Sequence, residues 1–211
     1  MDERAHGIVL RVYPLTETSL IIRWLTLEFG RISTVAKGAR RTKSPFRGKL
    51  DLFYRADLIF GRSRRSELHT LREVSPRETH SFLRKELEYL QQASYCSALI
   101  EQATESETPM PAMFNLLSEF LSFLSAQPPV PQSVFAFELK LLNELGLRPD
   151  LRKSSLTDGG KQIVQMLTGS DWGAISRLKV NPAQAGELRK FLHGFLIFHL
   201  GKLPDSRSAT T

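Results

Sequence analysis

The stretch Leu50-Asp51-Leu52-Phe53-Tyr54-Arg55-Ala56-Asp57-Leu58-Ile59-Phe60 alternates along its length. Successive side chains of a β-strand point to opposite faces, so residues two apart share a face. The apolar face consists of Leu50, Leu52, Tyr54, Ala56, Leu58 and Phe60. This alternation predicts a strand over residues 50–60 with one face buried in a core.

Other parts of the first third of the chain also have the composition of strands. These runs lie at residues 7–13, 19–27, 31–37 and 67–74. Turn-forming residues such as Pro14 and Gly30 separate them, and the polar, basic residues 38–49 are predicted to form a loop. Five strands without intervening helices predict a small barrel, and a length of about 75 residues fits the five-stranded OB-fold.

Apolar residues adopt helical spacing after Pro76. We expect helices over residues 81–103, 111–127, 132–145, 161–168 and 182–200. Gly146 has the position of a C-cap, and Asn181-Pro182 is an N-cap followed by proline at the first helical position. The predicted fold class is α+β multidomain, with an OB-fold barrel at 1–76, a helical partner-docking bundle at 77–204 and a disordered tail at 205–211.

Positive charge is concentrated in the predicted barrel. The whole chain has a formal net charge of +7. Residues 1–75 contain 15 Lys/Arg and 8 Asp/Glu, whereas residues 76–211 contain 14 of each kind. The densest part, residues 31–65, has 11 basic and two acidic residues. Such asymmetry indicates a polyanionic partner for the N-terminal part.

The basic segment combines cations with aromatic residues, as single-strand binders do. Phe46 lies in an otherwise polar loop and is the candidate for stacking on bases, whereas Trp24 and Tyr54 are expected in the core. Arginine dominates the cations, which suits bidentate contacts to phosphate. The predicted DNA-binding residues are Arg31, Lys37, Arg40, Arg41, Lys43, Phe46, Arg47, Lys49, Arg62, Arg64 and Arg65.

The third predicted helix carries more apolar surface than a single buried stripe needs. Phe137 and Leu141 form a second stripe beside the main one. Two interpretations remain open: the helix is buried on all sides, or it lines a groove for a partner peptide. Lys140, Arg189 and Lys190 would be at the rim of such a groove.

Motifs of the common enzyme classes are absent from the sequence, and we expect no enzymatic activity and no cofactor. Cys96 is the single cysteine, which excludes an intramolecular disulfide and a multi-cysteine zinc site. The start Met1-Asp2-Glu3-Arg4 lacks the apolar region of a secretory signal, and no apolar run approaches the roughly 18 residues of a membrane span. We therefore expect a cytoplasmic protein without a membrane partner.

Several short segments occur in the order of a known signature. They are Thr16–Ile21, Thr26–Arg31, Val35–Arg41, Gly48–Leu50, Leu71–Glu73, Phe137–Leu142 and Leu145–Leu151. Together they resemble the bacterial recombination mediator family RecO over most of residues 5–151.

The resemblance implies an OB-fold followed by a helical domain and a non-enzymatic role in recombinational DNA repair, in the bacterial cytoplasm at the nucleoid. It implies binding to single- and double-stranded DNA and annealing of complementary strands. It also implies action with RecR, docking of the acidic, Phe-ended tail of the single-stranded DNA-binding protein SSB on the helical domain, and help in loading RecA onto SSB-coated DNA.

The sequence departs from the family pattern in two places. Many members have a four-cysteine zinc module where this chain reads Arg152 to Gly160 without a cysteine, so we expect no metal. A pair of arginines is also missing before Phe137, where the chain has Phe135-Ala136.

Two other functions remain to be distinguished. In one, the chain is an interaction adaptor whose basic barrel docks an acidic protein. In the other, it is an enzyme acting on nucleic acid, which would need a metal cluster near the basic face. Only Asp51 and Asp57 lie there, on one face of the predicted strand.

Overall fold

A computed structural model of the chain describes residues 2–211. It divides into two compact units: Met1–Ser81 with Thr104–Asn115, and Phe82–Ala103 with Leu116–Thr211. The first unit contains the strands and the second most of the helices. Among residues 2–211, no helix is both long enough and apolar enough to cross a membrane.

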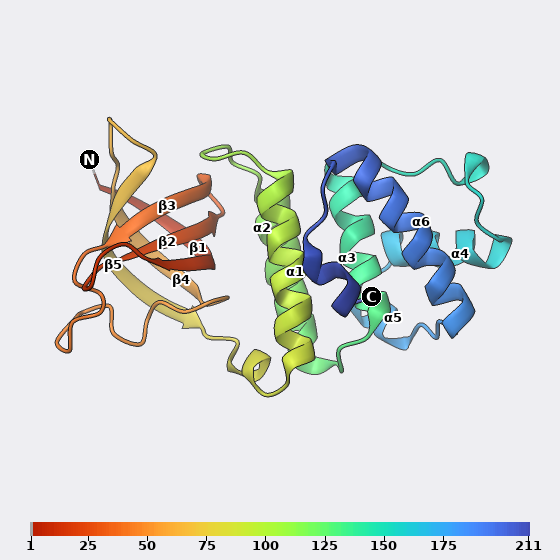
Figure 1. The fold of residues 1–211 in the computed structure, drawn as a ribbon, viewed down its shortest axis with the longest axis horizontal. Coiled ribbons are helices and arrows are strands. Elements are labelled where there is room, and N and C mark those ends of the chain that lie inside the picture. The colour runs from red at the N-terminus through yellow and green to blue at the C-terminus, as the bar shows by residue number, and fades with distance from the viewer. Residues whose placement is uncertain (1) are drawn as a thin grey trace. The chain divides into compact units, whose positions relative to one another are not determined.

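The first unit is a closed barrel (Figure 1). Its strands, within the described residues, are β1 Asp2–Pro14, β2 Leu20–Thr26, β3 Gly30–Ala36, β4 Arg55–Gly61 and β5 Leu68–Glu78. They neighbour each other in the order β1-β2-β3-β5-β4, and β4 pairs with β1 to close the barrel. The pairing of β3 with β5 is parallel and the others are antiparallel. The predicted five-stranded OB-fold barrel is therefore confirmed.

Strand β1 pairs with two strands, and this explains why it is longer than predicted. Its first half pairs with β4 and its second half with β2. At the crossing point, a Cβ added to Gly7 would come within 2.9 Å of both Leu58 and Trp24. Glycine therefore allows β1 to pass closely over the core, where the buried Trp24 ring donates a 2.9 Å hydrogen bond from Nε1 to Thr34 Oγ1.

The stretch 50–60 is a strand only in its second half. Ala56, Leu58 and Phe60 are each 1% exposed, as the alternation predicts. Residues 50–54, however, precede β4 and lie in irregular backbone, and Phe53 has a φ of 65°. A regular strand would place Phe53 on the face opposite Leu52 and Tyr54, but its side chain is turned inward and is 1% exposed. Its backbone N–H donates to Val9 O over 2.9 Å, which fixes the start of β4 against β1.

A segment distant in sequence completes the first unit. Thr104–Asn115 follows helix α1 (Leu87–Ala103) but packs with the barrel. Ser106 forms a parallel bridge with Arg31, and the Glu107 N–H donates to Arg31 O over 2.8 Å. The units thus differ in this segment from the predicted division into residues 1–76 and 77–204.

The second unit is a helical bundle. Its helices are α1 Leu87–Ala103, α2 Pro111–Ala126 from Leu116 onward, α3 Pro131–Glu144, α4 Asp158–Gly169, α5 Trp172–Arg177 and α6 Pro182–Leu200, with short 3₁₀ turns η1 Ser81–Arg84, η2 Leu151–Lys153 and η3 Asp205–Ala209. Helix α3 is the centre, since it packs on α1, α4, α5 and α6. The predicted helical part is confirmed.

The predicted helix ends have the expected caps. Gly146 has a φ of 72°, and its N–H donates to Asn143 O over 3.0 Å after the end of α3. Asn181 and Gln184 form a reciprocal capping box at the start of α6. These local signals explain why the bounds of α3 and α6 could be predicted well.

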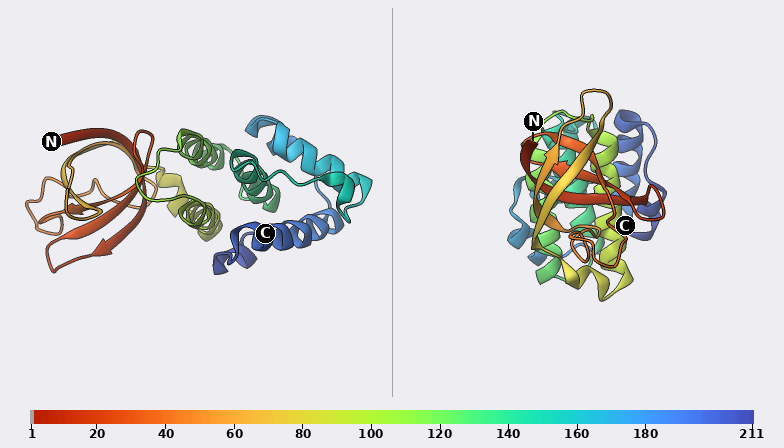
Figure 2. Two further views of the ribbon diagram at one scale, coloured as in Figure 1. Left: turned by 90° about the horizontal axis from the view of Figure 1, so that it is seen from above. Right: turned by 90° about the vertical axis from the view of Figure 1, so that its left-hand side faces the viewer.

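The last residues depart from the prediction of a disordered tail. Asp205–Ala209 form η3, which lies beside α6 (Figure 2). Arg207 is 5% exposed and donates from Nε to Glu138 Oε1 over 2.7 Å and from Nη2 to Glu138 Oε2 over 3.0 Å. Tyr95 donates to the same Glu138 Oε1 over 2.6 Å. A buried carboxylate on α3 therefore holds the end of the chain in place.

Candidate nucleic-acid interface

The basic loop between β3 and β4 is fixed to the barrel at several points. Ala39 and Phe46 are 8% and 7% exposed and belong to the barrel core. The Arg40 N–H donates to Thr18 O over 2.9 Å, which ties the loop to the connection between β1 and β2. The backbone positions that carry its cations are therefore fixed relative to the barrel.

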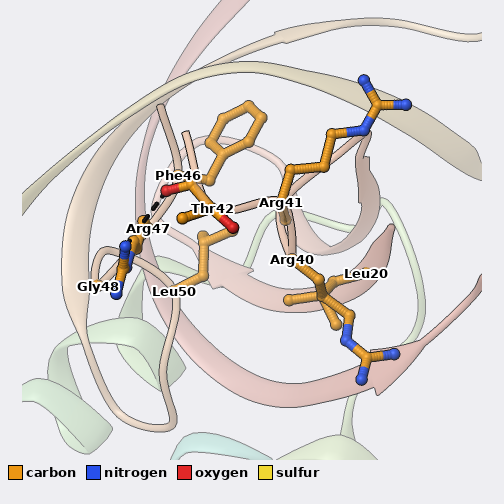
Figure 3. Close-up of a pocket in the computed structure, with 9 residues that line it drawn as sticks. Leu20, Arg40, Arg41, Thr42, Phe46, Arg47, Gly48 and Leu50 are labelled. Carbon is orange, nitrogen blue, oxygen red and sulfur yellow. Dashed lines mark hydrogen bonds between the residues drawn. The ribbon is translucent and has the colours of Figure 1, made fainter. Parts of the chain in front are cut away.

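An open pocket of about 390 Å³ lies in this loop (Figure 3). Leu20, Phe46 and Leu50 contribute apolar lining. Arg40 and Arg41 lie on one side of the pocket with their guanidinium groups pointing outward in different directions, and Arg47 lies on the other side. A polyanion crossing the pocket would therefore meet cations on both sides.

Most of the predicted cations of the loop are exposed. The exposed set is Lys37, Arg40, Arg41, Lys43 and Arg47, and Lys49 is half-buried. Arg47 donates to Thr42 O over 3.2 Å, which orients its guanidinium while its other donors remain available for an anion. The structure therefore brings these six predicted residues together on one loop.

The β4–β5 turn supplies a second group of cations. Ser63 Oγ accepts the N–H groups of Arg65 and Ser66 over 3.3 and 3.2 Å, which shapes the turn. Arg64 and Arg65 are exposed. Arg62, by contrast, already has an anionic partner, because Nη2 lies 2.5 Å from Glu107 Oε2.

Arg31 has a structural position that the prediction did not foresee. Its Nε donates to Thr104 Oγ1 over 3.0 Å and its Nη2 to Thr104 O over 2.7 Å. The guanidinium therefore holds the returning segment against the barrel instead of extending into solvent. The sequence could not show this, because Arg31 and Thr104 are 73 residues apart.

The assignment of Phe46 as an exposed stacking platform is corrected by its burial. The side chain is 7% exposed and packs in the barrel core. The Phe46 ring anchors the otherwise polar loop, because the apolar area that it buries holds the cationic loop on the barrel. Trp24, expected in the core, is 0% exposed, and Tyr54 packs partly buried against the same cluster.

The two aspartates considered for a metal site do not share a strand. Asp51 precedes β4 and accepts the Leu52 N–H through Oδ1, whereas Asp57 lies in β4 and pairs with Arg77 and His6. Hydrogen bonding to Asp57 raises the pKa of the Arg77 guanidinium. Over residues 2–211, no cluster of three or more His, Cys, Asp or Glu side chains is suited to hold a metal ion.

In the helical unit, two of the five predicted partner-binding residues, Phe137 and Leu141, are internal, and a third, Lys140, is half-buried. Phe137 and Leu141 are each 0% exposed, so the second apolar stripe of α3 is buried in the bundle and does not line a groove. Lys140 donates from Nζ to Ser170 O over 2.7 Å and lies 5.5 Å from the centre of the Trp172 ring. Burial lowers the pKa of Lys140, with nearby carboxylates of Glu119 and Asp171 opposing the shift.

Arg189 and Lys190 are exposed on α6, next to apolar surface that the sequence reasoning missed. Phe198 is 83% exposed and Ile197 is 42% exposed. Grooves of about 690 Å³ and 560 Å³ lie along α6, and Lys190 lines both of them. The signal in the sequence was the all-round apolar character of Phe191 to Leu200, which exceeds what one buried stripe requires.

Comparison with known proteins identifies the family. A sequence model described as "Recombination protein O N terminal" matches residues 1–80, and one described as "Recombination protein O C terminal" matches residues 84–160. A DNA repair protein RecO from Alkaliphilus metalliredigens is 28% identical over 95% of this chain and 94% of its own length. The chain belongs to the RecO family.

Other RecO relatives align over a shorter region. The Rhodopirellula baltica protein is 30% identical over 71% of this chain, and a Listeria monocytogenes protein is 31% identical over 73%. The chain spans 56% and 60% of the lengths of these two relatives. The fold described above, a barrel followed by helices, is thus the RecO arrangement of an N-terminal and a C-terminal part, and the family role is in DNA repair and recombination.

Proposed function

We propose that the chain is a non-enzymatic recombination mediator that binds the backbone of single- and double-stranded DNA through its barrel and anneals complementary strands. The observation that carries this proposal is the ordered cationic loop, with Arg40 and Arg41 on one side of an open pocket and Arg47 on the other.

The proposed mechanism is neutralisation of phosphate charge. Two strands repel each other through their phosphates, and cations that lie against both backbones reduce this repulsion. Contacts to phosphate carry no sequence information, so any pair of complementary strands can be held in this way. No bond is made or broken in this process.

The salt dependence of DNA binding tests the proposal. If about five side chains contact phosphate on a single strand, log K should fall with log salt with a slope of roughly −3 to −4. Replacement of Arg40, Arg41 and Lys43 by Ala should weaken binding to every sequence equally and reduce this slope by about 2. Fluorescence anisotropy with labelled oligonucleotides over a salt series measures both quantities.

A matched control removes the same charge from the helical unit. Arg152, Lys153 and Lys179 are exposed, and their replacement by Ala should leave both the affinity and the slope near those of the unchanged protein. Binding that does not depend on salt, or an equal loss in both triple variants, would argue against backbone binding by the loop. Failure to bind any oligonucleotide, together with tight binding of an acidic protein, would establish the adaptor function instead.

The helical unit is proposed to dock partner proteins. The exposed Phe198, the adjacent grooves and the flanking Arg189 and Lys190 combine apolar and cationic surface, which suits an acidic tail that ends in an aromatic residue. We propose that this surface binds the SSB tail, and that the protein acts with RecR to help load RecA onto SSB-coated DNA at the nucleoid of the bacterial cytoplasm.

Strand annealing with and without SSB tests this part. Replacement of Phe198 by Ala should leave annealing of naked strands unchanged and slow annealing of SSB-coated strands. Unchanged annealing of coated strands by this variant would exclude the α6 surface as the SSB site. Loss of annealing on naked strands as well would indicate a general defect.

A further inference from the structure

Glu107 is placed against the basic turn by the backbone of its own segment. Its N–H donates to Arg31 O over 2.8 Å, beside the bridge between Ser106 and Arg31. The approach is close: a Cβ added to Gly30 would lie 1.9 Å from Thr108 O, and Gly30 has a φ of 65°. Only glycine at this position allows the segment to lie where it does.

The carboxylate of Glu107 has two partners in the barrel unit. Its Oε2 lies 2.5 Å from Arg62 Nη2, and its Oε1 lies 3.3 Å from His69 Nε2. His69 is 1% exposed and stacks on Phe60 with ring centres 5.2 Å apart. Its Nδ1 accepts the Ser63 N–H over 3.3 Å, so the neutral ring carries its proton on Nε2 and donates it to Glu107.

The position of the carboxylate is thus fixed from three directions. The backbone bond to Arg31, the His69 ring and Arg62 hold it at the base of the β4–β5 turn. The Glu107 side chain is 28% exposed and that of Arg62 is 46% exposed, so an anion from solvent can reach the guanidinium.

We propose that Glu107 is an internal counter-ion that occupies the phosphate-binding position of Arg62 and thereby weakens nucleic-acid binding at the β4–β5 turn. The inference rests on the proposed DNA-binding function. An incoming phosphate must share or displace the carboxylate. Arg64 and Arg65 on the same turn are also exposed, and we expect them to bind phosphate without this competition.

The magnitude of the effect follows from the strength of exposed ion pairs. Such pairs are weak, with measured contributions that correspond to a change of about 1.4- to 5-fold in an equilibrium constant. Phosphate can therefore compete with Glu107, and removal of the carboxylate charge should tighten binding by about 1.4- to 5-fold. One additional phosphate contact should also steepen the salt slope on single-stranded DNA by about 0.7.

Glu107→Gln and Glu105→Gln form a matched pair. Both remove one negative charge from the same segment, and Glu105 is exposed. Affinity for a labelled oligothymidine is measured by anisotropy over a potassium chloride series. We expect tighter binding and a steeper slope for E107Q than for E105Q, and equal values for the two variants would overturn the proposal.

Arg62→Gln and Arg64→Gln provide a test that does not depend on the stability of E107Q. In the otherwise unchanged protein, R62Q should lose less than twofold in affinity and R64Q should lose more. In the E107Q background, R62Q should abolish the gain. Equal losses for R62Q and R64Q in the unchanged protein would contradict a counter-ion role.

The outcomes separate the two proposals. If the unchanged protein binds the oligonucleotide and the two glutamine variants behave alike, only the role of Glu107 is wrong. If neither the unchanged protein nor any variant binds it, the DNA-binding function itself is wrong, and the role of Glu107 with it.

Discussion

Arg207 and Glu138 form a bidentate ion pair inside the helical unit, with 2.7 Å between Nε and Oε1 and 3.0 Å between Nη2 and Oε2. The two side chains are 7% and 0% exposed. Burial alone would lower the pKa of Arg207, but the hydrogen bond and the charge of Glu138 outweigh it and raise the pKa. The last turn of the chain is therefore part of the core.

Replacement of Arg207 by Met should destabilise the helical unit by about 3–5 kcal/mol, because the carboxylate of Glu138 would remain buried without a cation. Chemical denaturation followed by circular dichroism measures this loss. Arg177→Met is the control, since Arg177 is exposed on α5 and should change stability little. Similar unfolding midpoints for the two variants would show that the pair does not hold the tail.

Cys96 should resist labelling by thiol reagents in the folded protein. The thiol is 0% exposed on α1, and burial, with a further contribution from Glu138, raises its pKa well above the ordinary value. Little thiolate is therefore present at pH 8, and what forms is inaccessible. Labelling with a chromogenic disulfide should be slow in buffer and fast in denaturant, and it should accelerate in R207M. Rapid labelling of the native protein would contradict the burial of α1.

His69 should make the barrel unit less stable in mild acid. Burial lowers the pKa of this ring from 6.5, and Arg62 acts in the same direction against the opposing charge of Glu107. The unfolded chain then binds a proton at a higher pH than the folded one, so stability is complete above pH 6.5 and falls as the pH decreases below it.

The measurement is the free energy of unfolding at several pH values between neutrality and mild acid. In His69→Gln, the decrease over this range should be smaller than in the unchanged protein. An identical decrease in both proteins would assign the acid sensitivity to other groups.

Two substitutions of Phe46 distinguish a role in anchoring the basic loop from a role in stacking on bases. Phe46→Ala should cost about 3 kcal/mol in barrel stability and weaken DNA binding, because a buried ring is lost and the loop is released. Phe46→Leu keeps much of the apolar volume, and it should retain most of the stability and the affinity. If F46L were fully stable but lost several-fold in affinity for single strands, the ring would be acting as a stacking platform.

The elements with strong local signals were predictable from the sequence. The alternation at Ala56, Leu58 and Phe60 and the capping residues of α6 report on neighbours within a few positions, and the structure agrees with them. The five-stranded barrel followed from the spacing of such elements.

The remaining features depend on partners that are distant in the chain. Arg31 and Thr104 are 73 residues apart, and Glu138 and Arg207 are 69 residues apart. Arg31, predicted to bind DNA, therefore donates hydrogen bonds within the protein. The tail that contains Arg207, predicted to be disordered, is anchored by Glu138. Residue type and spacing alone do not show which distant residue a side chain will contact in the folded protein.

The return of Thr104–Asn115 to the barrel determines how the protein can be divided into fragments. A piece that ends at residue 81 would contain all five strands, but Arg31 would lose its acceptors on Thr104, and Arg62 and His69 would lose Glu107. A complementary piece that begins at residue 82 would contain Thr104–Asn115 without the barrel on which this segment packs. The two units are therefore interleaved along the chain, and a binding measurement on an isolated barrel fragment would report a surface whose counter-ion has been removed.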